Sequence, residues 1–342
     1  MKAILFRTHG GPEVLEYTDA PQPAIGHGEV LVRVRACALN HLDIWVRCGL
    51  PGVNFPLPHI PGSDIAGEVA EIGPGVTTAR VGQKVVLTPG VSCGKCAACV
   101  AGLDNRCRQF TNLGYLIDGG CAEFVRVPEV NCLPYPENLS FEEAASVPLV
   151  FQTAWHMLVG RAELQPGEDV LVLGAGSGVG TAAIQIAKFF GARVIATAGS
   201  DEKLAKAKAL GADELINHKT QKIGAEVRRI TAKRGVDVVF EHVGTATWDE
   251  SIASLAPCGR LVTCGATTGY DAKIDLRFLF VRQLSLLGSY MGTKSELHTV
   301  MKLVAAGRLK PVVDRVFPLA EAAAAHAYLE SSSQFGKVVL KV

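Results

Sequence analysis

The sequence predicts an α/β protein with a β-rich first domain and a second domain built on a doubly wound parallel sheet. Up to about residue 130, short apolar runs alternate with Gly and Pro punctuation. From Gly167 to about Tyr290, strand-like runs instead alternate with helical stretches. The two patterns indicate different layer architectures. A length of 342 residues also favours two domains over a single core.

The first pattern contains the runs KAILFR, EVLVRVRACAL, DIAGEVAEIG and KVVLTPG, separated by segments such as PGVNFPLPHIPG. Strands of this length and spacing predict a compact, barrel-like domain. Residues 127–145 form a connector that we expect to end in a helix. Ser140 followed by Glu143 matches a capping box, which marks a helix N-terminus.

The second pattern contains six predicted strands, VLVLG, RVIATAG, ELIN, VDVVFEHVG, RLVTCGA and LSLLGSYMG. The helical stretch SDEKLAKAKALGA is expected to end near Gly211. After Met291 a helix precedes a last strand, FGKVVLKV, which we expect to return to the first domain. The predicted limits are residues 1–150 for the first domain, 151–290 for the second and 291–342 for the return.

Residues 170–180, VLVLGAGSGVG, join the first of these six strands to a helix through a glycine-rich turn. Such a turn lets backbone N–H groups at a helix N-terminus face a pyrophosphate, although glycine turns also serve tight packing. The six-strand context favours a dinucleotide site, because ligands bind at the carboxyl ends of parallel strands. The expected contacts are Gly174, Gly176, Ser177, Gly178, Val179 and Gly180.

Four cysteines follow one another closely as C-x2-C-x2-C-x7-C, at Cys93, Cys96, Cys99 and Cys107. Four thiolates at this density can close a tetrahedral zinc site and leave no open coordination position, so we expect one structural zinc per chain. An iron–sulfur cluster is the main alternative to zinc, but the usual bacterial motif has its fourth cysteine after three residues, followed by proline. In this chain seven residues precede the fourth cysteine and Arg108 follows it, so the spacing favours zinc. The other six cysteines are expected to be small buried hydrophobes.

The composition excludes several function classes. A net charge of +1 gives neither a basic field for nucleic acid nor a polybasic membrane anchor. The start, MKAILFRTHG, lacks a signal-peptide core, and the uncharged stretch 170–187 contains four glycines, which fits a turn better than a membrane span. Ten cysteines without a secretion signal indicate a reducing compartment, so we expect a cytoplasmic protein.

Together, the barrel-like domain, the cysteine lobe, the dinucleotide fold and the C-terminal return resemble the medium-chain dehydrogenase/reductase superfamily. The resemblance covers nearly the whole chain and includes the glycine-rich strand region GSDIAGEVAEIGPGV. It implies a GroES-like β-barrel catalytic domain and a Rossmann domain. The cysteine lobe matches the zinc alcohol dehydrogenases in spacing.

The chain departs from that family where a catalytic zinc is bound. When the chain is aligned on the shared Asp43, Asn40 occupies the position of the family's first cysteine ligand, and Ser63-Asp64 occupies the positions of its His-Glu pair. Leu149 occupies the position of the later cysteine ligand. Asn and Leu supply no thiolate and Ser is a poor zinc ligand, so we expect no catalytic zinc.

Asn40 and Asp43 in the pattern N-x-x-D, with Trp45 nearby, instead resemble the quinone oxidoreductase branch. A replacement metal site made of Asp64, His59 and Asp43 is an alternative, but such side chains near a turn more often form ordinary hydrogen bonds.

The cofactor choice depends on the end of the second strand of the sheet, where NAD-preferring members carry an acidic residue. In this chain that position is Ala198, followed by Ser200 and Lys203, which suit a 2′-phosphate. We therefore favour NADP(H) over NAD(H). Ser200 can also simply cap the next helix, and Asp201 can reach a ribose, so NAD stays open.

The resemblance implies further cofactor contacts. His41 stands where family members place a basic residue on the pyrophosphate, and Thr153 where they pack a residue behind the nicotinamide. The backbone around Val243, Gly265 and Ala266 closes the fourth and fifth strands and is expected to line the nicotinamide side. His41 can equally be a solvated loop residue.

The predicted function is hydride transfer from NAD(P)H to a quinone or an α,β-unsaturated carbonyl without catalytic zinc. The candidate catalytic residues are Asn40, as a donor to the substrate oxygen, and Asp43. Trp45, Phe55 and Leu149 indicate an apolar substrate pocket.

Two alternatives remain, a zinc-type alcohol dehydrogenase with an unusual ligand set and a non-catalytic NADPH-binding protein. The apolar run LSLLGSYMG ends the sheet and favours a homodimer or homotetramer.

Overall fold

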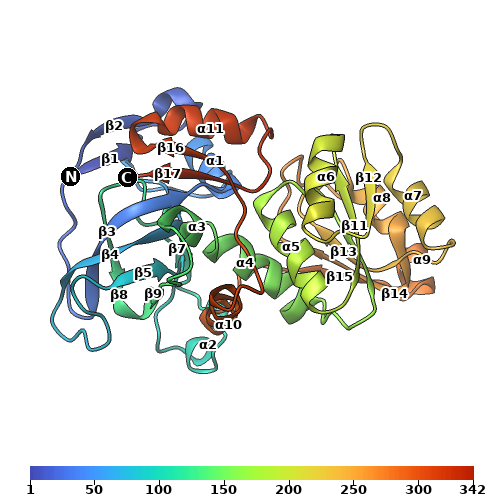
Figure 1. Cartoon of the computed structure of the whole chain (residues 1–342), viewed down its shortest axis with the longest axis horizontal. Helices are drawn as coiled ribbons and strands as arrows, with labels where there is room; N and C mark the ends of the chain where they lie inside the picture. The colour runs from blue at the N-terminus through green and yellow to red at the C-terminus, as the bar shows by residue number, and fades with distance from the viewer. The chain divides into compact units, whose positions relative to one another are not determined.

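The computed structural model describes residues 1–342 and divides them into two compact units. The first unit combines Met1–Leu149 with Thr293–Val342, and the second is Val150–Gly292 (Figure 1). Along the chain, the second unit is therefore inserted between the two parts of the first.

The first unit is built on a seven-stranded sheet in which β3 is central and pairs with three neighbours. The strand order is β16-β17-β3-β4-β5-β9, with β8 also paired to β3. The strands are β3 (Glu29–Ala38), β4 (Asp64–Ile72), β5 (Lys84–Leu87), β8 (Phe124–Pro128), β9 (Cys132–Pro134), β16 (Val313–Pro318) and β17 (Lys337–Lys341).

Strand β3 shows why this sheet forms. Its sequence EVLVRVRACA alternates over its middle, so that Val32 and Val34 are buried while Arg33 and Arg35 are exposed. Val32 pairs with Val69 of β4, and both belong to the hydrophobic core of the unit.

The C-terminal segment completes this sheet. Strand β17 pairs antiparallel with β3, with Leu340 opposite Cys37, and parallel with β16. This pairing brings Lys337, the first residue of β17, into the fold formed by the N-terminal segment.

Shorter elements surround the sheet. The predicted capping box is present at the start of α3, where Ser140 Oγ accepts a hydrogen bond from the backbone N–H of Glu143 at 3.2 Å. The helices are α1 (His41–Cys48), α2 (Ala97–Val100), α3 (Phe141–Ala145), α10 (Lys294–Ala305) and α11 (Ala322–Glu330), with 3₁₀ turns η1 (Pro12–Val14), η2 (Asp104–Arg106), η3 (Glu129–Asn131) and η5 (Leu319–Glu321). Two small ribbons pair β1 (Lys2–Leu5) with β2 (Glu16–Asp19) and β6 (Gly90–Val91) with β7 (Thr111–Asn112).

The second unit contains the predicted parallel sheet of six strands, in the order β12-β11-β10-β13-β14-β15. Because β10 comes first in the chain and lies between β11 and β13, the connections reverse direction there. The strands are β10 (Asp169–Val172), β11 (Arg193–Ala198), β12 (Glu214–Asn217), β13 (Val236–Glu241), β14 (Leu255–Thr263) and β15 (Ser285–Gly288). The doubly wound sheet is confirmed.

Helices connect these strands, as the alternating pattern predicts. They are α5 (Gly178–Phe189), α6 (Asp201–Ala209), α7 (Ile223–Ile230), α8 (Trp248–Ser254) and α9 (Leu276–Val281), preceded by α4 (Pro148–Trp155) and the π-helical η4 (His156–Arg161). No helix in the chain combines the length and the apolar character that crossing a membrane requires.

Candidate functional site

The glycine-rich turn lies at the carboxyl end of β10, where the strand order reverses. Ser177 is the N-cap of α5, and its Oγ accepts a hydrogen bond from Gly180 N–H at 2.9 Å. A Cβ on Gly180 would lie 2.4 Å from the carbonyl oxygen of Gly174, and Gly174 itself has a φ of +57°. The turn therefore requires glycine at these two positions. Its backbone is suitable for a pyrophosphate at the start of α5.

His242, which the sequence analysis missed, lies beside this turn. Its Nε2 is 2.9 Å from the carbonyl oxygen of Leu173 and 3.3 Å from Ser177 Oγ. A Cβ on Gly174 would approach the His242 ring to 3.0 Å, and burial lowers the pKa of His242. The imidazole therefore contacts both ends of the glycine-rich turn, at Leu173 and Ser177, and helps to fix its conformation.

The loops after β13 and β14 bring the predicted nicotinamide-side residues together. Thr268 N–H donates to the carbonyl oxygen of Val243 at 2.8 Å, and Gly269 N–H donates to that of Ala266 at 3.3 Å. Gly265 and Ala266 follow β14 directly, so both loops lie at the same edge of the sheet as the glycine turn.

Glu241, also missed, shapes the first of these loops. This fully buried carboxylate accepts hydrogen bonds from the backbone N–H groups of Val243 at 2.6 Å and Gly244 at 3.0 Å. The hydroxyl of Ser251 in α8 donates to it at 2.6 Å. In the sequence, the position of Glu241 at the end of the apolar run VDVVFE indicated a buried carboxylate that would need hydrogen-bond donors.

The ends of β11 and β12 form the adenosine side. Ser200 caps α6 by accepting a hydrogen bond from Lys203 N–H at 3.3 Å. Asp201 Oδ1 accepts a hydrogen bond from Asn217 Nδ2 at 2.8 Å. The structure adds His218 and Lys219 to this region, because both approach Gly199. In the sequence, these two basic residues directly follow the predicted strand ELIN, which could have indicated a role at this end of the sheet.

In the first unit, Asp43 is a fully buried carboxyl that holds two backbone N–H groups. It accepts from Asn40 N–H at 2.7 Å and from Gly62 N–H at 2.9 Å. Burial raises the pKa of Asp43 to about 6, against the opposing effects of these bonds and of the Lys337 charge. Its contacts fix the start of α1 to the segment before β4.

Asn40, Asp64 and Lys337 form a buried polar group that we call the Asn40 cluster. Asn40 Nδ2 donates to Asp64 Oδ2 at 2.9 Å, and Lys337 Nζ donates to Asn40 Oδ1 at 2.5 Å and to Asp64 Oδ2 at 2.9 Å. Leu149 N–H donates to Asp64 Oδ1 at 2.7 Å. The side chains of Lys337 and Asp64 are 3% and 0% exposed, so the ion pair is shielded from water.

The sequence analysis missed Lys337. Its signal was a lysine within the apolar run FGKVVLKV of residues 335–342. The sequence could not show that β17 places this ammonium against Asn40 and Asp64.

Ser63 and His59, also considered as metal ligands, each have a hydrogen bond to a backbone carbonyl oxygen. Ser63 is fully buried, and its Oγ donates to the carbonyl oxygen of Leu113 at 2.6 Å. His59 Nε2 lies 3.2 Å from the carbonyl oxygen of Gly114. The one group of three or more His, Cys, Asp or Glu side chains placed to hold a metal is formed by the four cysteines, and the replacement site of Asp64, His59 and Asp43 is not such a group.

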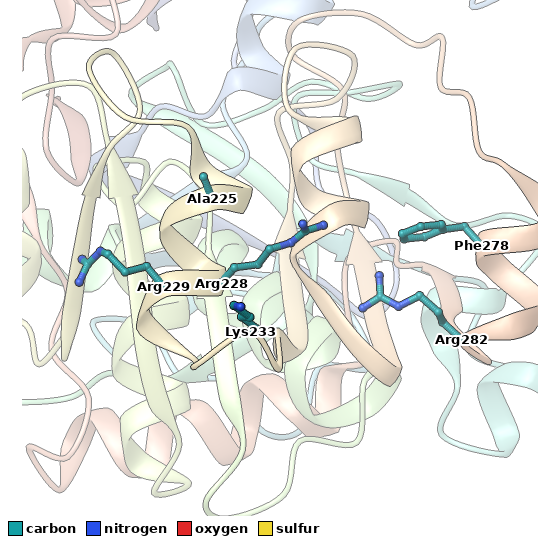
Figure 2. Close-up of a pocket in the computed structure, with 6 residues that line it drawn as sticks. All are labelled: Ala225, Arg228, Arg229, Lys233, Phe278 and Arg282. Carbon is teal, nitrogen blue, oxygen red and sulfur yellow. The ribbon is translucent and has the colours of Figure 1, made fainter.

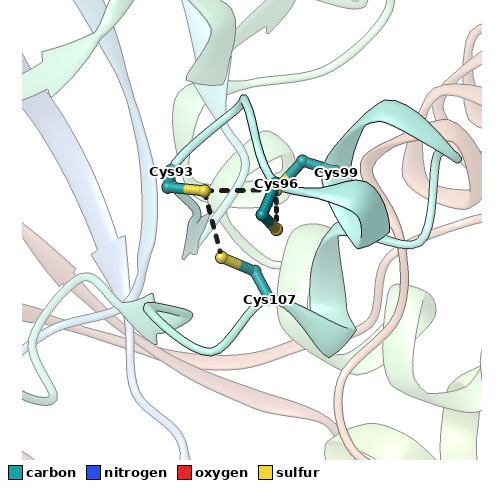
Figure 3. A group of neighbouring side chains, drawn as sticks. All are labelled: Cys93, Cys96, Cys99 and Cys107. Atoms are coloured by element: carbon teal, nitrogen blue, oxygen red, sulfur yellow. Dashed lines mark hydrogen bonds between the residues drawn. The ribbon is translucent and has the colours of Figure 1, made fainter.

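Figure 3 shows those four cysteines turned toward a common point. Cys99 belongs to the short helix α2, which begins directly after Cys96. All four sulfurs lie within 4.8 Å of one another. The Sγ atoms of Cys93 and Cys107 are 3.5 Å apart and those of Cys96 and Cys99 are 3.6 Å apart. Four soft donors around one point fit a structural zinc.

The predicted pocket residues differ in their surroundings. Phe55 is buried against Phe6 and Val46, and its ring meets Tyr115 edge-on at 5.3 Å between centroids. Trp45 is only half-buried and its ring lies 4.9 Å from that of exposed His41. Thr153 is buried in α4 of the second unit.

A basic cavity of about 540 Å³ lies elsewhere on the second unit. In Figure 2, Arg228 and Arg282 face each other and Arg229 points away. Arg282 Nη2 donates to the carbonyl oxygen of Leu255, the first residue of β14. The cavity therefore adjoins the amino ends of the strands, opposite the glycine turn. Its lining residues are Ala225, Arg228, Arg229, Lys233, Phe278 and Arg282.

Comparison with known proteins agrees with this arrangement. Residues 26–137 match the model of the alcohol dehydrogenase GroES-like domain, and residues 178–306 match that of the zinc-binding dehydrogenases. A crystal structure of an NAD-dependent alcohol dehydrogenase shares 51% identity with a TM-score of 0.97, and all of both chains is covered.

Curated relatives include enzymes named for other substrates. The acryloyl-coenzyme A reductase of Metallosphaera sedula is 34% identical over 99% of both chains. The quinone oxidoreductase of Rattus norvegicus is 31% identical over 99% of this chain and 97% of its own. With a glycine turn at the reversal point of the sheet and matches over the whole length, the chain belongs to the medium-chain dehydrogenase/reductase superfamily and is an NAD(P)-dependent oxidoreductase.

Proposed function

We propose that this oxidoreductase transfers hydride from NADPH to a quinone or an α,β-unsaturated carbonyl without a catalytic metal. The observation that carries the proposal is the Asn40 cluster. Asn40 and Asp64 are bonded to Lys337, and Ser63 is bonded to Leu113. Leu149 contributes only its N–H. The positions where zinc-type relatives hold the metal are thus committed to internal bonds.

Reaction chemistry then favours a conjugated acceptor. A bound metal ion contributes several kcal/mol by polarising a simple carbonyl. Conjugation spreads the negative charge that develops in a quinone or enone, so less stabilisation is required from the protein. The names of the quinone oxidoreductase and the acryloyl-coenzyme A reductase among the relatives support this class of acceptor.

The bound nicotinamide supplies the hydride, and the chain supplies orientation. The N–H groups at the start of α5 would hold the pyrophosphate, with His41 as a second contact. Glu241 holds the loop of Val243 in place, and Thr153 would pack behind the nicotinamide.

We assign to Asn40 the donor role toward the substrate oxygen. The hydrogen bond from Asn40 Nδ2 to the carbonyl oxygen of Ala38 is long, at 3.4 Å, and is the bond that a substrate oxygen would replace. Asp43 positions α1, and solvent provides the proton. Trp45 and Leu149 give the pocket its apolar character, whereas the packing of Phe55 against Phe6 supports a structural role.

NADPH is proposed because Ala198 ends β11 without a carboxylate, while Ser200 and Lys203 follow it. Asp201 is bonded to Asn217, which supports the same choice. The name of the 51% identical structure favours NADH as the second candidate. If the proposal holds, A198D shifts the preference toward NADH by about tenfold, the effect of one lost charge-assisted contact; an unchanged preference contradicts it.

We also propose assembly through the β15 edge of the sheet. Leu276, Phe280 and Val281 of neighbouring α9 are 65%, 67% and 69% exposed, while the opposite edge strand, β12, carries Glu214 and Asn217. An apolar edge strand favours pairing with a second copy, giving a homodimer or homotetramer. None of the ten cysteines forms a disulfide, which supports a reducing compartment, the cytoplasm.

The deciding experiment measures zinc content and turnover together. NADPH and NADH are each assayed against a quinone, an enone, an aldehyde and an alcohol. The proposal expects a single zinc per chain, bound by the cysteines, and NADPH oxidation by the quinone or the enone. Two zinc ions with alcohol-dependent cofactor reduction support the zinc-type alcohol dehydrogenase instead. Tight cofactor binding without turnover supports a non-catalytic role.

A further inference from the structure

Three cationic side chains line the basic cavity of the second unit. Arg228 and Arg282 face each other there, and Lys233 completes the group (Figure 2). The guanidinium of Arg282 is held in place, because it donates to the carbonyl oxygen of Leu255 and its Cζ atom lies 4.8 Å from the centroid of the Phe278 ring. The fold therefore brings together cations from the end of α7 and the end of α9.

The acidic side chains of the neighbouring helices have other partners. Glu226 of α7 pairs with Arg229 at 2.8 Å, and Asp275, which caps α9, pairs with Arg277 at 2.8 Å. Glu250 of α8 accepts a hydrogen bond from a backbone N–H of α7 at 2.6 Å. No ion pair of the chain includes one of the three cavity cations, so their charge is not balanced within the protein.

Helix ends offset only part of this charge. Burial and the charge of Arg228 lower the pKa of Arg282, which shows that the two guanidiniums interact. Basic residues near a helix C-terminus favour the helix dipole, and α7 and α9 both end at the cavity. Each helix end has about half a negative charge, whereas the cavity has the three positive charges of Arg228, Lys233 and Arg282. A surplus of about two charges therefore remains for an anion.

Lys233 occupies a position that the backbone alone would give to glycine. Its φ is +70°, in the left-handed region, and its N–H donates to the carbonyl oxygen of Arg228 at 2.6 Å, which closes the end of α7. Glycine adopts this conformation without steric cost, whereas a side chain crowds the following carbonyl oxygen. The ammonium group is thus present at the cavity despite a backbone that disfavours any side chain there.

We propose that Arg228, Lys233 and Arg282 bind the phosphate groups of a small phosphorylated compound, at a site separate from the dinucleotide site. A phosphate has a charge of about −1.5 to −2 and three acceptor oxygens, which suits two guanidiniums and an ammonium better than a carboxylate does. The cavity of about 540 Å³ lies within the range of small-molecule sites, about 300–1,000 Å³. It adjoins the amino end of β14, whereas cofactor phosphates bind at the carboxyl ends of the strands.

Assembly through the β15 edge is expected to leave this cavity accessible. With 3.6 residues per turn, Phe278 and Arg282 fall on one face of α9 and its C-cap, and Leu276 and Phe280 fall on the other. The exposed apolar residues that favour pairing with a second copy are therefore separate from the side chains that line the cavity.

The test measures the binding of inorganic pyrophosphate by isothermal titration calorimetry, with the nicotinamide cofactor bound at the glycine-rich turn. Malonate at the same ionic strength is the comparison anion, because it carries carboxylates in place of phosphates. We expect wild type to bind pyrophosphate at least about tenfold more tightly than malonate, since phosphate offers more charge and more acceptor oxygens. The assay measures binding alone, so its result does not depend on the proposed reaction.

The variants are R228Q and K233G, with K222Q as the control. Each of the first two should weaken pyrophosphate binding by about tenfold, the effect of one lost charge-assisted contact. K233G removes the ammonium and relieves the backbone, so denaturant unfolding should show no loss of stability and a folding defect is not the cause. Lys222 is exposed at the opposite end of α7, so K222Q makes the same charge change away from the cavity and should match wild type.

Three results would overturn the site. The first is an affinity for pyrophosphate that is the same in wild type, R228Q and K233G, and the second is the absence of binding to wild type. If R228Q also loses stability in either case, Arg228 serves the end of α7 alone. The third is equal affinity for malonate and pyrophosphate, because the cavity then does not recognise phosphate.

Discussion

The first unit contains two polar clusters that differ in what their donor atoms contact. In the cysteine lobe, four sulfurs lie within 4.8 Å of one another, and no ammonium or guanidinium group is bonded to them. In the Asn40 cluster, the oxygens of Asn40 and Asp64 accept hydrogen bonds from N–H groups and from the Lys337 ammonium. The difference teaches that a metal site requires donor atoms that converge on one point without a cation of the chain among them.

The two clusters also balance charge differently. Four thiolates require an external cation, whereas the buried Asp64 already has one from the chain, at 2.9 Å. We therefore expect an ion to complete the cysteine lobe, whereas strand β17 completes the Asn40 cluster. The following changes test this contrast, beginning with the largest expected effect.

Replacing Lys337 with methionine should destabilise the protein most. The K337M variant leaves the Asp64 charge buried without its ammonium, which costs about 4 kcal/mol of unfolding free energy. Denaturant unfolding measures this loss. The control is K341M on the same strand, whose lysine is 67% exposed and should cost less than about 1 kcal/mol. Equal losses in the two variants would show that the cluster contributes nothing.

Removing zinc from the cysteine lobe should have the next largest effect. C99S is expected to lose the metal, and the unfolding free energy should fall by about 3 kcal/mol, the value for a ligand present at about a hundred times its Kd. Metal analysis and denaturant unfolding give the two readouts. C48S alters an exposed cysteine outside the lobe and should retain the zinc. A C99S variant with full zinc content contradicts the assigned site.

Asp43 should give the protein a stability that depends on pH. The folded-state pKa of Asp43, about 6, lies above the usual value of 3.8, so the folded protein binds a proton more readily than the unfolded chain. Stability from this group therefore rises as pH falls from about 7 to 4, by about 2 kcal/mol.

The check on Asp43 compares wild type with D43N over that pH range. D43N removes the titration but also weakens the bonds to two backbone N–H groups, so the slope against pH is the informative quantity. Parallel slopes would show that Asp43 is not protonated in the folded protein.

Changing Ser63 to alanine should have the smallest effect. S63A loses one neutral hydrogen bond to the carbonyl oxygen of Leu113, worth about 1 kcal/mol. Zinc content should not change, because Ser63 is not a ligand. A fall in bound zinc would show that the two clusters are not distinct.

The sequence predicts those features that local pattern determines. The six strands of the second unit, the caps of α3 and α6 and the cysteine cluster all rest on residues close together in the chain. Strand period, glycine spacing and cysteine spacing carry that information directly. The fold class was accessible for this reason.

Contacts between distant segments were not accessible in this way. Lys337 meets Asp64 only because β17 pairs with β3, and His218 meets Gly199 only because β12 pairs with β11. Glu241 stood at the end of an apolar strand, yet nothing local showed that Ser251 and two backbone N–H groups would surround it. A side chain's partners depend on tertiary register, which periodicity does not specify.

The ion pair of Asp64 and Lys337 has a consequence for synthesis on the ribosome. The two residues are separated by 273 positions, and the whole second unit lies between them in the chain. Chains fold largely in the order in which they are made. Asp64 and Asn40 therefore emerge without their cation, and the Val150–Gly292 unit can fold before β17 exists. Asp64 has no Lys337 partner until that residue has been made and β17 has paired with β3, so completion of the Asn40 cluster reports that the chain has been made through Lys337.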